Sequence, residues 1–169
     1  ISITNTAAQD VTNTRAYYRL DGGATYSSPV GTITAQSTVN VLLLPPLDIP
    51  ASGIHDLEVW VYSADDDFHF NDTITTQILQ TPFVNSFPYT EGFENSNGGY
   101  VTDGIRSTWT HGVPGKQIIS KAAEGNKVWT TSLNGTHNAQ EISYLYSPCF
   151  DLHGLAQPYL SFGFMFELE

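Results

Sequence analysis

The chain has 169 residues, a formal net charge of −11, one cysteine, 12% aromatic residues and 14% charged residues. This excess of acidic charge repels phosphate, which argues against nucleic acid and anionic membranes as partners. A single cysteine excludes an intrachain disulfide framework. No apolar run approaches the roughly 18 residues that a membrane helix needs.

The composition predicts an all-β protein, because Thr, Ser, Val, Ile, Tyr and Phe dominate and suit a pleated, half-buried surface. The length fits two modules of about 80 to 90 residues better than one. We expect a first β-sandwich over residues 1–81 and a second over residues 82–169, joined by a proline-containing segment. We interpret both ends of the sequence as points where a strand is interrupted, since Ile1 is not a natural first residue.

In the first module, short alternating stretches and glycine turns predict a series of strands. Residues 39–44 form a fuller apolar run, which predicts a strand buried on both faces. Residues 57–62 alternate, so that Leu57, Val59 and Val61 should face the core while the residues between them face outward. A last strand is expected over residues 73–79.

About seven short strands in this order are typical of an immunoglobulin-like sandwich. The segments at residues 3–5, 18–23, 53–57 and 71–74 resemble the adhesion-related, CARDB-like Ig repeats that occur in tandem in bacterial surface proteins. The resemblance implies an Ig-like spacer.

An acidic stretch before the last strand allows two interpretations. Asp65, Asp67, His69 and Asn71 alternate, and Asp66 and Asp72 add further oxygen atoms, which is the chemistry that calcium prefers. The stretch lacks the glycine and the glutamate of an EF-hand loop, so a solvated turn between strands is the favoured interpretation.

In the second module, aromatic or apolar anchors are each followed by a turn, at residues 87–94, 109–114, 122–135, 141–152 and 158–162. This spacing resembles the jelly-roll MAM-like module found beside secreted metallopeptidases and the cleaved-adhesin domains of surface haemagglutinins. Residues 160–169 alternate most clearly and predict a strand. In these modules further strands follow, so we expect a truncated jelly roll whose open edge is covered by more polypeptide or by a partner.

The jelly-roll resemblance also implies a structural calcium ion, with Glu94 as a ligand and Asn126 as a second one. The alternative is that Glu94 caps a turn or pairs with Lys127.

Four aromatic residues are candidates for a ligand platform, because a ring face stacks on a pyranose; they are Trp60, Tyr62, Tyr89 and Tyr100. Thr73, in the Asp-Thr-Ile sequence, resembles the O-glycosylation motif of exported proteins in gliding-type bacteria, which use type IX secretion.

No Gly-x-Ser-x-Gly, His-Glu-x-x-His or phosphate-loop motif occurs, and no catalytic residue is expected. We therefore interpret the chain as a non-catalytic module pair of a large secreted or cell-surface bacterial protein, with a protein or glycan ligand. The alternative is a pair of accessory modules of a secreted peptidase or glycan-degrading enzyme whose catalytic domain lies outside this chain.

Overall fold

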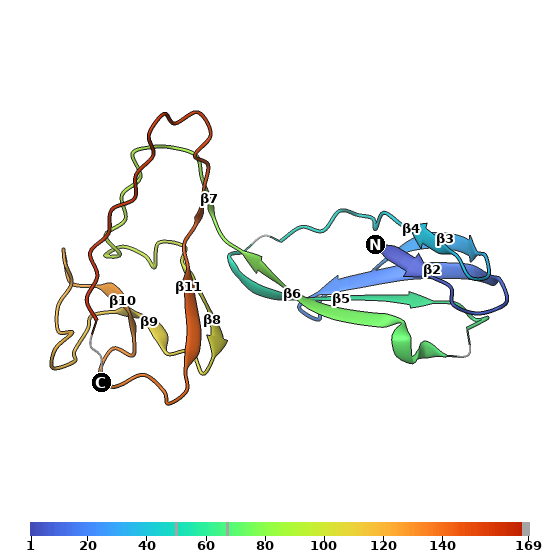
Figure 1. The fold of residues 1–169 in the computed structure, drawn as a ribbon, viewed down its shortest axis with the longest axis horizontal. Helices are drawn as coiled ribbons and strands as arrows, with labels where there is room; N and C mark the ends of the chain where they lie inside the picture. The colour runs from blue at the N-terminus through green and yellow to red at the C-terminus, as the bar shows by residue number, and fades with distance from the viewer. Residues whose placement is uncertain (50, 67, 167–169) are drawn as a thin grey trace. The chain divides into compact units, whose positions relative to one another are not determined.

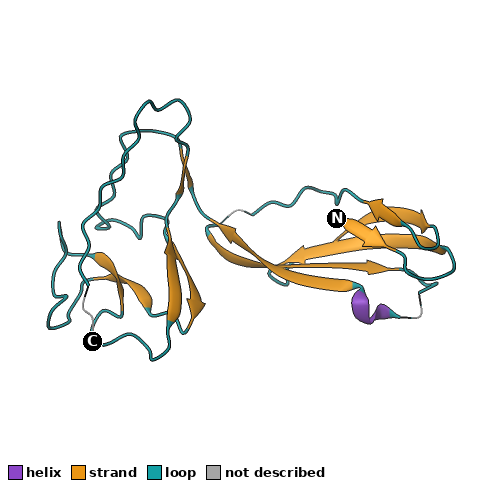
Figure 2. Cartoon of the chain, viewed as in Figure 1, coloured by secondary structure: helices purple, strands orange, loops and turns teal. Residues whose placement is uncertain are grey.

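The computed structural model describes residues 1–49, 51–66 and 68–166 (Figure 1). The described residues form strands and loops with a single short 3-10 turn, η1 (His69–Asn71), which is purple in Figure 2, so the all-β prediction is confirmed. The chain divides into two compact units, Ile1–Gln80 (unit 1) and Thr81–Glu169 (unit 2).

Unit 1 is built on a four-stranded antiparallel sheet in the order β3-β2-β5-β6. A short second sheet pairs β1 with β4. The strands of unit 1 are β1 (Ser2–Thr4), β2 (Val11–Leu20), β3 (Tyr26–Ile33), β4 (Thr38–Asn40), β5 (Gly53–Tyr62) and β6 (Thr73–Gln80).

Side-chain alternation gives the four-stranded sheet an inner and an outer face. Ala16 and Tyr18 of β2 lie opposite Val61 and Val59 of β5, and both β2 residues are almost completely buried, at 0% and 3% exposure. Leu57 shares this inner face, as the alternation in residues 57–62 predicts. The residues between them therefore form the outer face.

The predicted strand at residues 39–44 is formed only at its start and is not buried on both faces. Strand β4 ends at Asn40, and Leu42 and Leu44 are 79% and 53% exposed. Pro45 and Pro46 follow and have no N–H groups for a strand ladder. Val41 still exchanges hydrogen bonds with Ile1, but the N–H of Leu44 donates to the Ser28 hydroxyl at 2.8 Å, so the strand pairing ends before Leu44.

Among the described residues of unit 2, the strands form three two-stranded sheets. The first is parallel and the other two are antiparallel. The pairs are β7 (Phe83–Val84) with β12 (Cys149–Phe150), β8 (Val101–Ile105) with β11 (Ile142–Tyr146), and β9 (Trp109–Gly112) with β10 (Val128–Thr131).

Unit 2 buries its apolar side chains less completely than unit 1 does. Apart from Pro114 and Pro148, none of its described apolar residues is fully buried, and Trp109 and Trp129 are only half-buried. In compact domains large aromatic residues normally supply most of the buried apolar area. The described part of unit 2 therefore leaves much of its apolar surface uncovered.

The predicted strand at residues 160–169 is not formed in the part that the structure describes. Residues 160–166 belong to no sheet, and Phe162, Phe164 and Phe166 are 70%, 74% and 65% exposed. A strand needs a hydrogen-bonding neighbour, and no described segment pairs with this one. Residues 167–169, with Leu168, lie outside the described residues.

Candidate functional site

The outer face of the four-stranded sheet in unit 1 carries a cluster of aromatic and charged side chains, which we call the aromatic face: Tyr17, Arg19, Glu58, Trp60 and Tyr62. Tyr17 of β2 lies directly opposite Trp60 of β5. Their rings are 5.4 Å apart and only 8° from parallel. Cross-strand pairing on one face of a sheet thus positions two large ring surfaces side by side.

An ion pair borders these rings. Arg19 lies opposite Glu58, and its Nε donates to the Glu58 carboxylate. The guanidinium carbon also lies 5.6 Å from the centre of the Trp60 ring, within the range of a cation–π interaction. The two charges neutralise each other, and the guanidinium lies against one side of the Trp60 ring.

Tyr62 extends the aromatic face beyond Trp60, because residues two apart in a strand share a face. It is 51% exposed and stacks on His69 of η1, with ring centres 5.7 Å apart. Thr73, the candidate O-glycosylation residue, is the exposed first residue of β6 and lies opposite Trp60. Of the four predicted platform residues, Trp60 and Tyr62 therefore lie together.

The other two predicted platform residues belong to unit 2 and are packed there. Tyr89 meets Phe150 edge to face at 5.2 Å, and Tyr100 meets Phe93 in the same way at 5.3 Å. Burial, assisted by the negative charge of Glu91, raises the pKa of both tyrosines. Both rings contribute to the packing of unit 2.

The predicted calcium ligands Glu94 and Asn126 are brought together, and their contact is a turn cap. The Oε1 atom of Glu94 accepts the backbone N–H groups of Lys127 at 2.6 Å and Asn126 at 2.7 Å, and these bonds lower the pKa of the carboxyl. The Lys127 ammonium donates to the carbonyl oxygen of Glu94. A Cβ atom on Gly125, whose φ is +66°, would lie 2.5 Å from the same carboxylate oxygen, so glycine is required there.

The carboxylates of the acidic stretch serve its local structure. Asp65 accepts the N–H and hydroxyl of Thr12, and these two bonds lower its pKa. Asp66 accepts the N–H of Phe68 at 2.9 Å, and Asp72 lies 2.9 Å from the His69 ring. Asp67 lies outside the described residues, and among those described no group of three or more His, Cys, Asp or Glu side chains could hold a metal. These contacts are the ones expected of a solvated turn.

Glu141 was not singled out by the sequence, yet it is the most heavily bonded carboxylate described here. It accepts bonds from the N–H and hydroxyl of Thr108, the hydroxyl of Ser143 and the N–H of Asn138. Desolvation acts to raise its pKa, but these donors outweigh it and lower the pKa to about 2. The Asn138-to-Glu141 spacing, in which a carboxylate bonds back to an N–H three residues earlier, is the signal that could have revealed it.

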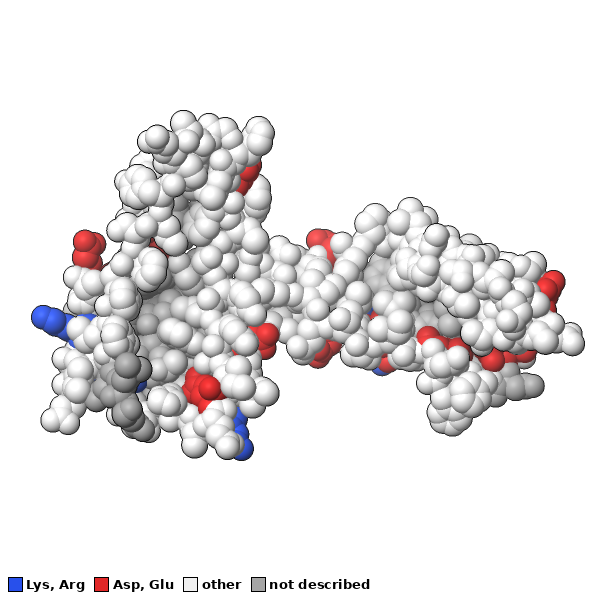
Figure 3. All heavy atoms as spheres, in the orientation of Figure 1, with Lys and Arg blue, Asp and Glu red and all other residues white. Residues whose placement is uncertain are grey.

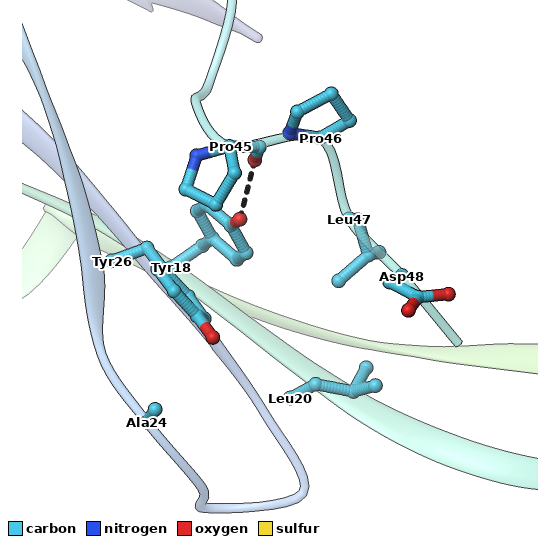
Figure 4. Close-up of a pocket in the computed structure, with 8 residues that line it drawn as sticks. All are labelled: Tyr18, Leu20, Ala24, Tyr26, Pro45, Pro46, Leu47 and Asp48. Atoms are coloured by element: carbon cyan, nitrogen blue, oxygen red, sulfur yellow. Dashed lines mark hydrogen bonds between the residues drawn. The ribbon is translucent and has the colours of Figure 1, made fainter. Parts of the chain in front are cut away.

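A cavity of about 350 Å³ opens at one end of the inner face of unit 1 (Figure 4). The Tyr18 hydroxyl donates to the carbonyl oxygen of Pro45 beside it. The Tyr18 and Tyr26 rings stack 5.2 Å apart. The cavity is lined by Tyr18, Leu20, Ala24, Tyr26, Pro45, Pro46, Leu47 and Asp48.

Comparisons with protein-family models, with curated proteins and with solved structures give no match for this chain. Among the described residues, no helix has the length and apolar character to cross a membrane.

Proposed function

We propose that the chain is a non-catalytic pair of binding modules from a large secreted or cell-surface bacterial protein. In this proposal unit 1 is an Ig-like module and unit 2 is a jelly-roll adhesion module, and the ligand is a neutral glycan on another surface. The all-β architecture and the two compact units support this assignment.

The observation that carries the proposal is the parallel Tyr17–Trp60 pair on the outward face of unit 1. A sugar ring presents flat C–H surfaces that stack on aromatic rings, while its hydroxyl groups need donors and acceptors at the edge of the stack. Arg19 and Glu58 supply both kinds of group beside Trp60. Because these two charges compensate each other, the face suits an uncharged ligand.

The surface charge favours the same ligand class. On the face that Figure 3 shows, acidic side chains are scattered and basic ones are few. A chain with a net charge of −11 repels polyanions. Neutral glycans are compatible with such a surface, as are neutral or basic proteins.

An accessory role in a secreted peptidase or glycan-degrading enzyme is the alternative, since the same face would then direct that enzyme to its substrate. Calcium bound by Glu94 and Asn126 also belongs to the proposal, as a structural ion of unit 2. The proximity of these two residues supports it.

The proposal is tested by screening the whole chain on an array of neutral glycans and measuring the affinity of the best binder by calorimetry. Trp60→Ala should weaken that binding by about tenfold or more, as expected for a central aromatic contact. Tyr159→Ala is the matched control, because it removes a ring that is 93% exposed in unit 2. Absence of binding to every glycan, or equal binding by Trp60→Ala, would overturn the proposal.

A further inference from the structure

The cavity of about 350 Å³ in unit 1 is lined partly by β2, β3 and the turn between them, and partly by residues 45–48. Two hydrogen bonds attach the second lining segment to the sheet. The Tyr18 hydroxyl donates to the carbonyl oxygen of Pro45. Just before it, the N–H of Leu44 donates to the Ser28 hydroxyl at 2.8 Å. These bonds hold the walls of a cavity whose volume lies in the range of small-molecule sites.

The lining is mostly apolar and includes two aromatic rings. Tyr18 and Tyr26 stack 5.2 Å apart and 24° from parallel. Tyr18 is only 3% exposed, whereas Tyr26 is 42% exposed and so presents ring surface to a bound molecule. A second hollow of about 50 Å³ shares Tyr18 and Leu47 with the first and adds Leu43 and Leu57. The apolar surface thus continues beyond the cavity and can receive an apolar body.

The charge at the cavity is negative. Asp48 is the charged residue of the lining, and its side chain is exposed. Within the part of the chain that the structure describes, its carboxylate has no hydrogen bond or ion pair. Figure 4 shows the two tyrosine rings on one side of the cavity and Leu47 and Asp48 on the other. An aromatic ring face and a carboxylate both attract a cation.

We propose that this cavity binds a small organic cation, namely an ammonium group carried on an apolar or aromatic body. The apolar body packs against the tyrosine rings and Leu47, and the ammonium group pairs with the Asp48 carboxylate. The net charge of −11 favours the same sign of ligand and disfavours an anion. Because Tyr18 and Trp60 belong to opposite faces of the sheet, the site is separate from the aromatic face and does not rest on glycan binding.

The test compares three probes that share one phenyl body and differ in charge. They are 2-phenylethylammonium, the neutral 2-phenylethanol and the anionic 3-phenylpropanoate. Each is titrated into the whole chain at pH 7 while the backbone amide signals of Ala24 and Leu47 are followed by NMR. The ammonium probe should saturate these shifts with the lowest Kd, and the anion should bind most weakly. Equal affinities for the ammonium and the alcohol, or no shift of the cavity amides, would overturn the proposal.

Asp48→Asn provides the second measurement, because it removes the charge while keeping the shape of an exposed side chain. It should weaken binding of 2-phenylethylammonium roughly two- to fivefold, as expected for an exposed ion pair, and leave binding of 2-phenylethanol unchanged. Glu124→Gln is the matched control, since it removes the same charge from an exposed carboxylate that does not line the cavity. An unchanged preference for the ammonium in Asp48→Asn, or an equal loss in Glu124→Gln, would contradict the assignment of Asp48.

Discussion

Trp60 and Tyr17 lie face to face across neighbouring strands of unit 1, 5.4 Å apart and nearly parallel. The pair is outside the core, because the opposite face of the same two strands carries the buried Ala16 and Tyr18. Two large rings on an outward face expose apolar area that folding alone does not require. This relationship is the basis of the proposed ligand surface.

Glu141→Gln should destabilise unit 2. The substitution leaves one acceptor oxygen for four donors, so some donors lose their partner. Losing a bond to a charged group and leaving its donor unpaired costs roughly 1–3 kcal/mol in the free energy of unfolding. Chemical denaturation at pH 7 measures it. Glu124→Gln, at an exposed carboxylate, is the control and should change stability little.

The low pKa of Glu141 predicts that unit 2 loses stability in acid. Its pKa is lowered from 4.5 to about 2, so its contribution is complete above pH 4.5 and is lost as the pH falls toward 2. The stability difference between the unaltered chain and Glu141→Gln should therefore shrink across this range. A difference that stays constant from pH 7 to pH 2 would show that the four bonds do not stabilise the folded state.

Calcium should raise the melting temperature of unit 2, because an ion that binds only the folded state stabilises it by mass action. Glu94→Ala should abolish this calcium-dependent increment. The increment is the readout, since the substitution also removes the bonds to Asn126 and Lys127 and lowers the melting temperature by itself. Glu124→Ala should keep the increment. If a chelator leaves the melting curve of the unaltered chain unchanged, the calcium assignment fails.

The apolar segment at residues 159–166 should make the chain self-associate. It carries no charge, and Tyr159 and Leu160 are 93% and 80% exposed. Exposed extended apolar segments pair with other chains. Light scattering should detect oligomers, and replacing Phe162, Phe164 and Phe166 together by Ser should reduce them. A stable monomer of 18.5 kDa formed by the unaltered chain would contradict this expectation.

Much of the local structure could be predicted from composition and alternation. The inward positions of Leu57, Val59 and Val61 follow from a period of two, and Trp60 and Tyr62 then necessarily share the outer face. The partner of Trp60 could not be predicted, because Tyr17 is 43 positions away and only the strand register brings the two rings together. Arg19 and Glu58 join the face for the same reason.

The missing parts of the two predicted strands have a common physical origin. Apolar alternation reports which side chains could be buried, whereas a strand also requires a neighbouring backbone. Residues 42–44 lie beside a side-chain hydroxyl and are followed by two prolines, and residues 160–166 have no described partner. Likewise, the bonds from Thr108 to Glu141 join positions far apart in the chain, which leaves little trace in sequence spacing.

If the aromatic face of unit 1 binds a neutral glycan, the three tryptophan indole N–H signals of the chain should report where the glycan binds. A glycan selected on the array is titrated into the unaltered protein while these signals are followed by NMR. The Trp60 signal should shift and saturate with the ligand, while those of Trp109 and Trp129 in unit 2 stay in place. A saturating shift of the Trp109 or Trp129 signal with the Trp60 signal unmoved would show that the glycan does not bind the aromatic face.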